Sequence, residues 1–187
     1  MPASQVEHTR AVALTYSFRK DFEIMSSGSL LLARLSDPEN LVPAAEVLEH
    51  SEIVECWNAV DGHVDLVAKL SAPPTKLLEQ IRGLGGVQEL DVIEISDESG
   101  KFLCNPAFCY SIVFLEVESG KLASIRDRLA AISQVSFCSS KQDSSEIIAA
   151  VSGNTFQSVD RAINEQIRPI DGVLRLKQDR VINLKQI

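Results

Sequence analysis

The sequence is poor in aromatic residues and has no excess of basic ones. Phenylalanine, tryptophan and tyrosine make up 5% of its 187 residues, and 26 acidic residues against 18 basic ones give a formal net charge of −8. Proteins that bind nucleic acid neutralise phosphates with lysine and arginine, so this balance argues against a DNA-binding surface across the whole molecule. The chain also lacks a basic-then-apolar leader and any apolar run near the ~18 residues that span a bilayer. We therefore expect a soluble, cytoplasmic protein with no membrane partner.

Cysteine and histidine are scarce as well. Cys104 and Cys109 lie close in sequence, but no second Cys or His pair follows at the spacing of a zinc site. His50 and His63 match no known ligand spacing either, and no serine has a His and Asp set placed to activate it. We expect no metal, no cofactor and no enzymatic activity. The four cysteines are expected to be free thiols, mostly buried: Cys56, Cys104, Cys109 and Cys138.

The charge is distributed unevenly along the chain. Residues 1–98 contain 7 basic and 17 acidic residues, whereas residues 99–187 contain 11 and 9. Only the second half therefore has enough basic residues to form a local basic patch. An acidic first half favours a cationic or amine-bearing partner, if it binds one.

Apolar spacing in the first half alternates between strand and helix periods. Gly85 and Gly86 end the second helix by permitting left-handed backbone angles. The predicted elements are a strand at 30–35, a helix at 39–50, strands at 53–60 and 64–70, a helix from Pro73 to Leu84, and a strand at 87–95. This order, β-α-β-β-α-β, is typical of a ferredoxin-like unit.

The second half repeats this order. We predict strands at 112–117, 135–138 and 146–151, a helix at 121–132, a helix over 159–167 with Asn154 or Thr155 as N-cap, and a last strand at 174–184. The repeat keeps its register, because equivalent residues are separated by 82 (Leu30 to Ile112), 81 (Val54 to Val135) and 86 (Gly86 to Gly172) positions.

The repeat predicts an α+β protein of two tandem ferredoxin-like βαββαβ units packed as an α/β sandwich. We place an N-terminal extension at 1–28, which suits a short strand or a helix equally well. The first unit is placed at 29–98 and the divergent second unit at 110–187, with a linker around 101–108. Two fused units could pair within one chain or associate with other copies through their sheets.

Three stretches of the first unit resemble a known family. They are Ile53-Val54-Glu55-Cys56-Trp57, then the run from Val60 to Lys69, and finally Leu84-Gly85-Gly86-Val87. They are similar to the effector-binding (RAM) domain of Lrp/AsnC transcription regulators, with Gly62 and Asp65 at its Gly-x-x-Asp hairpin. The second unit matches only in pattern, since Asp143 and Glu146 stand at the equivalent positions.

The resemblance implies a ligand-sensing protein. Small effectors of that family, commonly amino acids, bind near the hairpin, so the expected effector-binding residues are Asp61, Gly62, His63 and Asp65. Asp65 has a second interpretation, in which its carboxylate only secures its own hairpin. The family's helix-turn-helix module is missing, so we expect a stand-alone regulator that binds an amino acid and associates through its sheets without contacting nucleic acid.

Three alternatives stay open from the sequence. The protein could act by forming mixed oligomers with DNA-binding Lrp/AsnC members. Tandem ACT domains share the same element order and also bind amino acids, although Ser36-Asp37-Pro38-Glu39 departs from their usual opening. An enzyme of the haem pathway built on a similar fold is the least favoured.

Overall fold

The computed structural model describes residues 28–102 and 107–182. The predictions for residues 1–27, for Cys104 and for the end of the last strand lie outside the described residues. No helix within the described ranges is long and apolar enough to cross a membrane.

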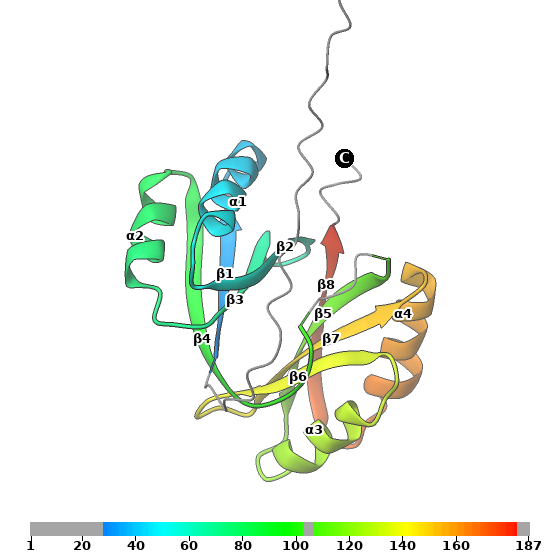
Figure 1. Cartoon of the computed structure of the whole chain (residues 1–187). Coiled ribbons are helices and arrows are strands. Elements are labelled where there is room, and N and C mark those ends of the chain that lie inside the picture. The colour runs from blue at the N-terminus through cyan, green and yellow to red at the C-terminus, as the bar shows by residue number, and fades with distance from the viewer. Residues whose placement is uncertain (1–27, 103–106, 183–187) are drawn as a thin grey trace, which may run out of the picture.

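Each half of the chain forms one βαββαβ unit (Figure 1). The first consists of β1 (Ser29–Leu35), α1 (Leu41–Glu49), β2 (Val54–Asp61), β3 (Leu66–Leu70), α2 (Thr75–Gly83) and β4 (Val87–Gly100). The second consists of β5 (Cys109–Val117), α3 (Leu122–Ala130), β6 (Val135–Lys141), β7 (Glu146–Gly153), α4 (Phe156–Ala162) and β8 (Val173–Ile182). A 3-10 turn at Pro38–Asn40 precedes α1, and a π-helical segment at Ile163–Ile167 extends α4.

Local chemistry explains where the helices begin and end. Thr155 is the N-cap of α4: its hydroxyl accepts from the amide of Ser158, and the Ser158 hydroxyl interacts with the amide of Thr155 in return. This reciprocal capping satisfies amides that a helix start leaves without partners. Gly86 and Gly172 follow the second helix of each unit with φ of +66° and +94°. Only glycine adopts these angles without strain, so both positions end the helix and start the next strand.

The two sheets join into one closed, entirely antiparallel ring. The order around the ring is β1-β3-β2-β8-β5-β7-β6-β4, with β4 returning to β1. The units therefore meet at two joints, where β2 pairs with β8 and β4 pairs with β6. The predicted α+β class and the tandem βαββαβ units are confirmed, and each unit has its helices on one face of its sheet. The division of the chain at 29–98 and 110–187 stays a prediction, because one continuous sheet runs through both units.

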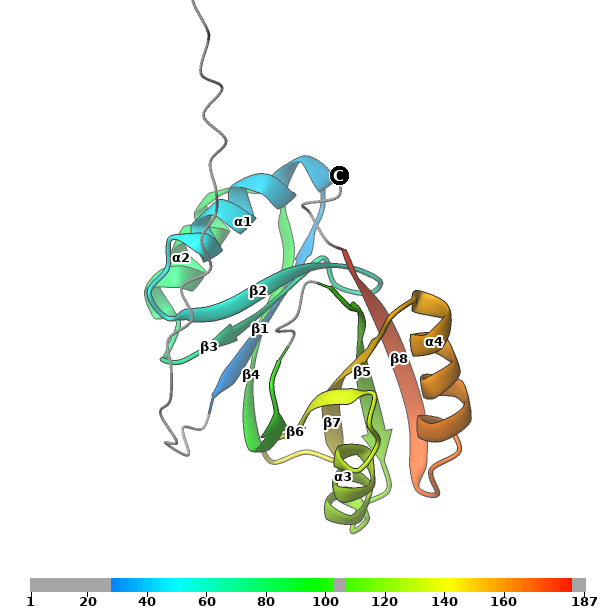
Figure 2. The ribbon, with the colours of Figure 1, turned by 45° about the vertical axis from the view of Figure 1, so that its right-hand side comes forward.

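Apolar side chains fill the space inside the ring as well as the space under the helices. Figure 2 shows α1 and α2 beside the first sheet and α3 and α4 beside the second, so each unit has its own core beneath its helices. Between the sheets, the rings of Phe102 and Phe137 pack edge to face with centroids 5.0 Å apart. The other buried members of this interior core are Leu30, Leu32, Val60, Val64, Val67, Ile93, Ile95, Ile112, Ile148 and Ala150.

The described cysteines contribute to this packing and form no disulfide. Cys138 is fully buried, and burial raises the pKa of its thiol to about 12. Cys56 is half-buried and donates its thiol to the carbonyl of Phe102. Cys109 is half-buried as well. The expectation of free thiols stays a prediction.

Candidate functional site

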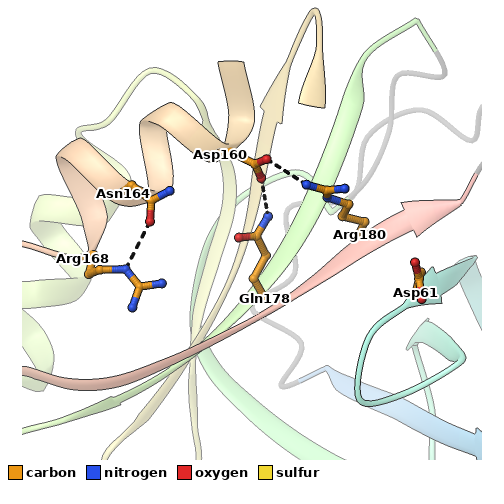
Figure 3. A pocket seen from close by; sticks show the side chains of 6 residues that line it. All are labelled: Asp61, Asp160, Asn164, Arg168, Gln178 and Arg180. Carbon is orange, nitrogen blue, oxygen red and sulfur yellow. Dashed lines mark hydrogen bonds and ion pairs between the residues drawn. The ribbon is translucent and has the colours of Figure 1, made fainter. Parts of the chain in front are cut away.

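A shallow polar pocket lies on the outer side of the joint between β2 and β8. It has a volume of about 480 Å³. Its described lining residues are Asp61, Asp160, Asn164, Arg168, Gln178 and Arg180. Asp61 comes from the first unit and the other five come from the second, so the pocket exists only because the two units meet (Figure 3).

Asp160 organises the wall of the pocket that α4 and β8 form. Gln178 and Arg180 are two residues apart on β8, so both side chains emerge on the same face of the strand, toward α4. Gln178 Nε2 donates to Asp160 Oδ1 at 2.8 Å and to Ser111 Oγ at 3.1 Å, and the Arg180 guanidinium donates to Asp160 Oδ2 at 2.8 Å. The Asp160 carboxylate is thereby engaged on both oxygens, so this wall is held in place before any ligand arrives.

Two charged groups of the pocket have atoms that no described residue binds. Arg168 Nε donates to Asn164 Oδ1 at 3.2 Å, one helical turn away, and within the described residues its two terminal nitrogens have no partner. The exposed carboxylate of Asp61 likewise has no hydrogen bond or ion pair in the described part of the chain. Figure 3 shows Arg168 and Asp61 at opposite sides of the pocket, with Arg180 between them and nearer to Asp61. The pocket therefore presents a positive charge and a negative charge to the same space.

His63 lies on the other face of the same joint, bound to a buried carboxylate. Asp179 is 1% exposed, and its Oδ1 lies 2.6 Å from His63 Nδ1 and 3.0 Å from the His63 amide. Its Oδ2 accepts from the amide of Val64 at 3.4 Å. An ionised carboxylate only accepts, so Nδ1 of His63 must be the protonated nitrogen. The imidazole also packs edge to face on Phe114, with centroids 4.7 Å apart.

The remaining predicted residues, Gly62 and Asp65, have structural roles that the structure shows directly. Gly62 does not have a positive φ; glycine is required there because a Cβ would collide with the Asp179 carboxylate. Asp65 Oδ2 accepts from the amide of Leu35 at 2.6 Å, so this carboxylate secures the end of β1 rather than its own hairpin.

The four predicted effector residues are thus not gathered in one cavity. Only Asp61 lines the pocket, while His63 lies on the inner side of the joint. Their assignment as effector-binding residues stays a prediction. The wall that the second unit contributes to the pocket was not among the residues predicted from the sequence. One signal for it was present, because Asn164 and Arg168 have the i, i+4 spacing of neighbours on a helix.

A second ionic cluster lies at the other joint. Lys69 Nζ lies 2.5 Å from Glu98 Oε2 and 3.4 Å from Glu55 Oε2, and it also lies 5.8 Å from the centroid of the Phe137 ring. Burial alone would lower the pKa of Lys69, but the two carboxylates outweigh burial and raise it above its usual 10.5. The charge of the lysine is therefore satisfied by its own chain.

No described residues form a metal site of recognisable composition. Within residues 28–102 and 107–182, no group of three or more His, Cys, Asp or Glu side chains is placed to hold a metal ion.

Comparison with known proteins shows the fold and no family. No protein-family model and no curated protein matches the chain. Among solved structures, the siroheme decarboxylase NirDL matches with a TM-score of 0.65 and 11% identity over 83% of this chain and 71% of that one. NirDL in complex with an iron-uroporphyrin III analogue matches with a TM-score of 0.66 over the same shares. A protein with a provisional monooxygenase name from Lactobacillus acidophilus NCFM matches with a TM-score of 0.55 and 9% identity, over 83% of this chain and 93% of that one.

These findings correct the expected relationship to Lrp/AsnC effector-binding domains, which is wrong. The similarity is to the fold of monooxygenase-like proteins and NirDL, at identities that establish the fold alone. The physical reason is that the motif residues meet requirements of the backbone. Gly62 makes room for Asp179, Asp65 binds the end of β1, and Gly86 adopts a positive φ after α2. These structural roles account for the matching residues without a shared family.

Proposed function

We propose that this protein is a non-enzymatic binding protein with a regulatory role, and that its ligand is a small zwitterion such as an amino acid held in the pocket at the β2–β8 joint. The observation that carries the proposal is the pair of uncommitted charges, Arg168 and Asp61, on opposite sides of one pocket. The Arg168 guanidinium suits a carboxylate, because its fork of donors matches the two oxygens. The Asp61 carboxylate suits an ammonium group.

The chemistry of the lining favours binding over catalysis. The described lining consists of two carboxylates, two guanidinium groups and two amides, and it includes no thiol, hydroxyl or imidazole. Its volume of about 480 Å³ falls within the range of small-molecule sites. Because the pocket is shallow and polar, water competes for each charge, and we expect dissociation constants near 1 mM.

A tetrapyrrole, the kind of molecule named for NirDL, is less well supported for this chain. His63 has the chemistry of an iron ligand, with Nδ1 anchored on a carboxylate. However, the space between the two sheets is filled by the interior core, including Phe102 and Phe137. The residues present do not fit a bound macrocycle inside the ring.

The pairing of the units within one chain supports a pseudo-dimeric form of the proposal. Asp61 is supplied by the first unit and Arg168 by the second, so the second unit takes the place that a partner subunit would have in a two-chain protein. Bound ligand would bridge the units. A change in the stability of the joint is then the output that a regulatory partner could detect.

Isothermal titration calorimetry with each of the common amino acids tests the proposal. We expect binding by the wild-type protein, and loss of about tenfold or more in affinity for Arg168→Ala and for Asp61→Asn, since each removes a charged contact. Arg128→Ala is the matched control, because Arg128 is an exposed arginine on α3 outside the pocket. No heat for any amino acid at 10-fold above the expected dissociation constant, or equal loss in the control, would reject the proposal.

A further inference from the structure

We propose that His63 and Asp179 are positioning residues that hold the two walls of the pocket together and so set its affinity. This inference rests on the proposed function, because it concerns the same pocket. Neither side chain lines the pocket. Asp179 is next in the chain to Arg180, which does line it, and His63 is separated by one glycine from Asp61, which also does.

The position of the pair in the chain is the first step of the argument. Asp179 immediately precedes Arg180, and His63 follows Asp61 by two positions. Neighbouring residues on a strand point to opposite faces, so Asp179 lies inside the ring while Arg180 faces α4. A bond between His63 and Asp179 on the inner face therefore fixes the spacing between Asp61 and Arg180 on the outer face.

The weakness of the backbone pairing at this joint is the second step. Within the described residues three pairs join β2 to β8, and the pairing ends at the hairpin with the third of them: Ala59 with Ile182, Val60 with Val181, and Asp61 with Arg180. The end of a ladder opens easily unless side chains secure it.

The burial of Asp179 is the third step. A carboxylate at 1% exposure is costly to bury, and its three contacts, from two amides and one imidazole, all come from the hairpin of the first unit. If the joint opened, all three would be lost together. Gly62 completes the arrangement, because any side chain at this position would push the Asp179 carboxylate away. The pair and the glycine form one device, which we name the inner clasp.

Two measurements on the whole protein test the inner clasp. The first is hydrogen exchange of the amides in residues 59–61 and 180–182, without ligand. We expect His63→Ala to speed exchange there by about tenfold and to leave the β4–β6 joint unchanged, because one charge-assisted bond is lost at one joint only. The second is calorimetric titration with the amino acid that binds best to the wild type, where we expect a dissociation constant about tenfold higher.

Rescue and control variants separate positioning from general destabilisation. His63→Asn places an amide donor near the position of Nδ1, so it should restore much of both the protection and the affinity. His50→Ala is the matched control, because His50 follows α1 and, among the described residues, the one hydrogen-bond partner of its side chain is the carbonyl of Glu46 on its own helix. Unchanged exchange at the joint in His63→Ala would overturn the inference whatever the ligand does. Absence of binding by the wild type would reject the proposed function, and the exchange result would still decide whether the clasp holds the joint.

Discussion

The two units have equivalent backbones where their first and last strands pair, β1 with β4 and β5 with β8, and different chemistry there. Leu30 pairs with Ile93 in the first unit, and at the equivalent place in the second unit Ile112 pairs with Asp179. An apolar residue that packs into the interior core is thus replaced by a buried carboxylate. One residue further along each strand, Glu94 is replaced by Arg180.

The difference shows how a duplicated fold can build a single site. Beside the β4–β6 joint, Lys69 of β3 is satisfied by Glu98 of β4 and Glu55 of β2. At the β2–β8 joint the buried charge of Asp179 is satisfied by the hairpin, and the outer charges of Asp61 and Arg168 are left for a ligand. The β4–β6 joint therefore only closes the ring, whereas the β2–β8 joint closes the ring and also carries the candidate binding site.

The largest expected effect concerns the aromatic packing beside each joint. Phe137 is 1% exposed and packs on Phe102, so Phe137→Ala should lower the free energy of unfolding by about 3–5 kcal/mol. Phe114 is half-buried against His63, so Phe114→Ala should lower the free energy of unfolding by only about 1–2 kcal/mol. Urea denaturation of both variants measures the difference. Equal losses would mean that the two joints are packed alike.

Glycine substitutions should also lower the free energy of unfolding more at the β4–β6 joint than at the β2–β8 joint. Gly100 has a φ of +83°, and a Cβ there would collide with the backbone of Ser136 on β6. Gly100→Ala should therefore cost about 2–4 kcal/mol. Gly62→Ala displaces only the side chain of Asp179 and should cost about 1–2 kcal/mol. Thermal unfolding of the two variants, with Gly83→Ala as a control at an open position, checks the ranking. A larger loss for Gly62→Ala would contradict it.

The smallest expected effect is a dependence of stability on alkaline pH, which comes from Lys69 beside the β4–β6 joint. The folded-state pKa of Lys69 is raised, so its contribution to stability is complete below its usual 10.5 and is lost as the pH rises through the raised value. Wild-type protein should lose more stability than Lys69→Met as the pH rises from about 10 to about 12. Melting temperatures of both proteins across this range provide the measurement. Parallel curves would show that Lys69 contributes nothing to the pH dependence.

The sequence predicts the units well because each element is encoded locally. Apolar spacing and the glycines after each second helix place the strands, and the positive φ of Gly86 and Gly172 confirms the predicted helix ends. Thr155 acts as the N-cap that its residue type favours. The predicted helix at 39–50 is shorter, at Leu41–Glu49, because a 3-10 turn capped by Asp37 takes its first residues.

The joints and the pocket could not be predicted in this way. His63 and Asp179 are 116 residues apart, and no local pattern reports a bond over that distance. Asp61 was among the candidate residues, but for its place on a hairpin and not for the charges across the joint. Arg168 and Arg180 become neighbours of Asp61 only when the ring closes, which depends on the register of two strands from different units.

The closed order of the ring has a consequence for synthesis on the ribosome. β2 leaves the exit tunnel early, but the strand that pairs with its outer edge, β8, is the last of the described strands to be made. The first unit must therefore wait with an open edge and with one side of its sheet exposed to water. Nascent chains in that state bind chaperones or associate with one another. The acidic residues concentrated in the first half would keep such waiting chains apart by mutual repulsion until the final strand completes the fold.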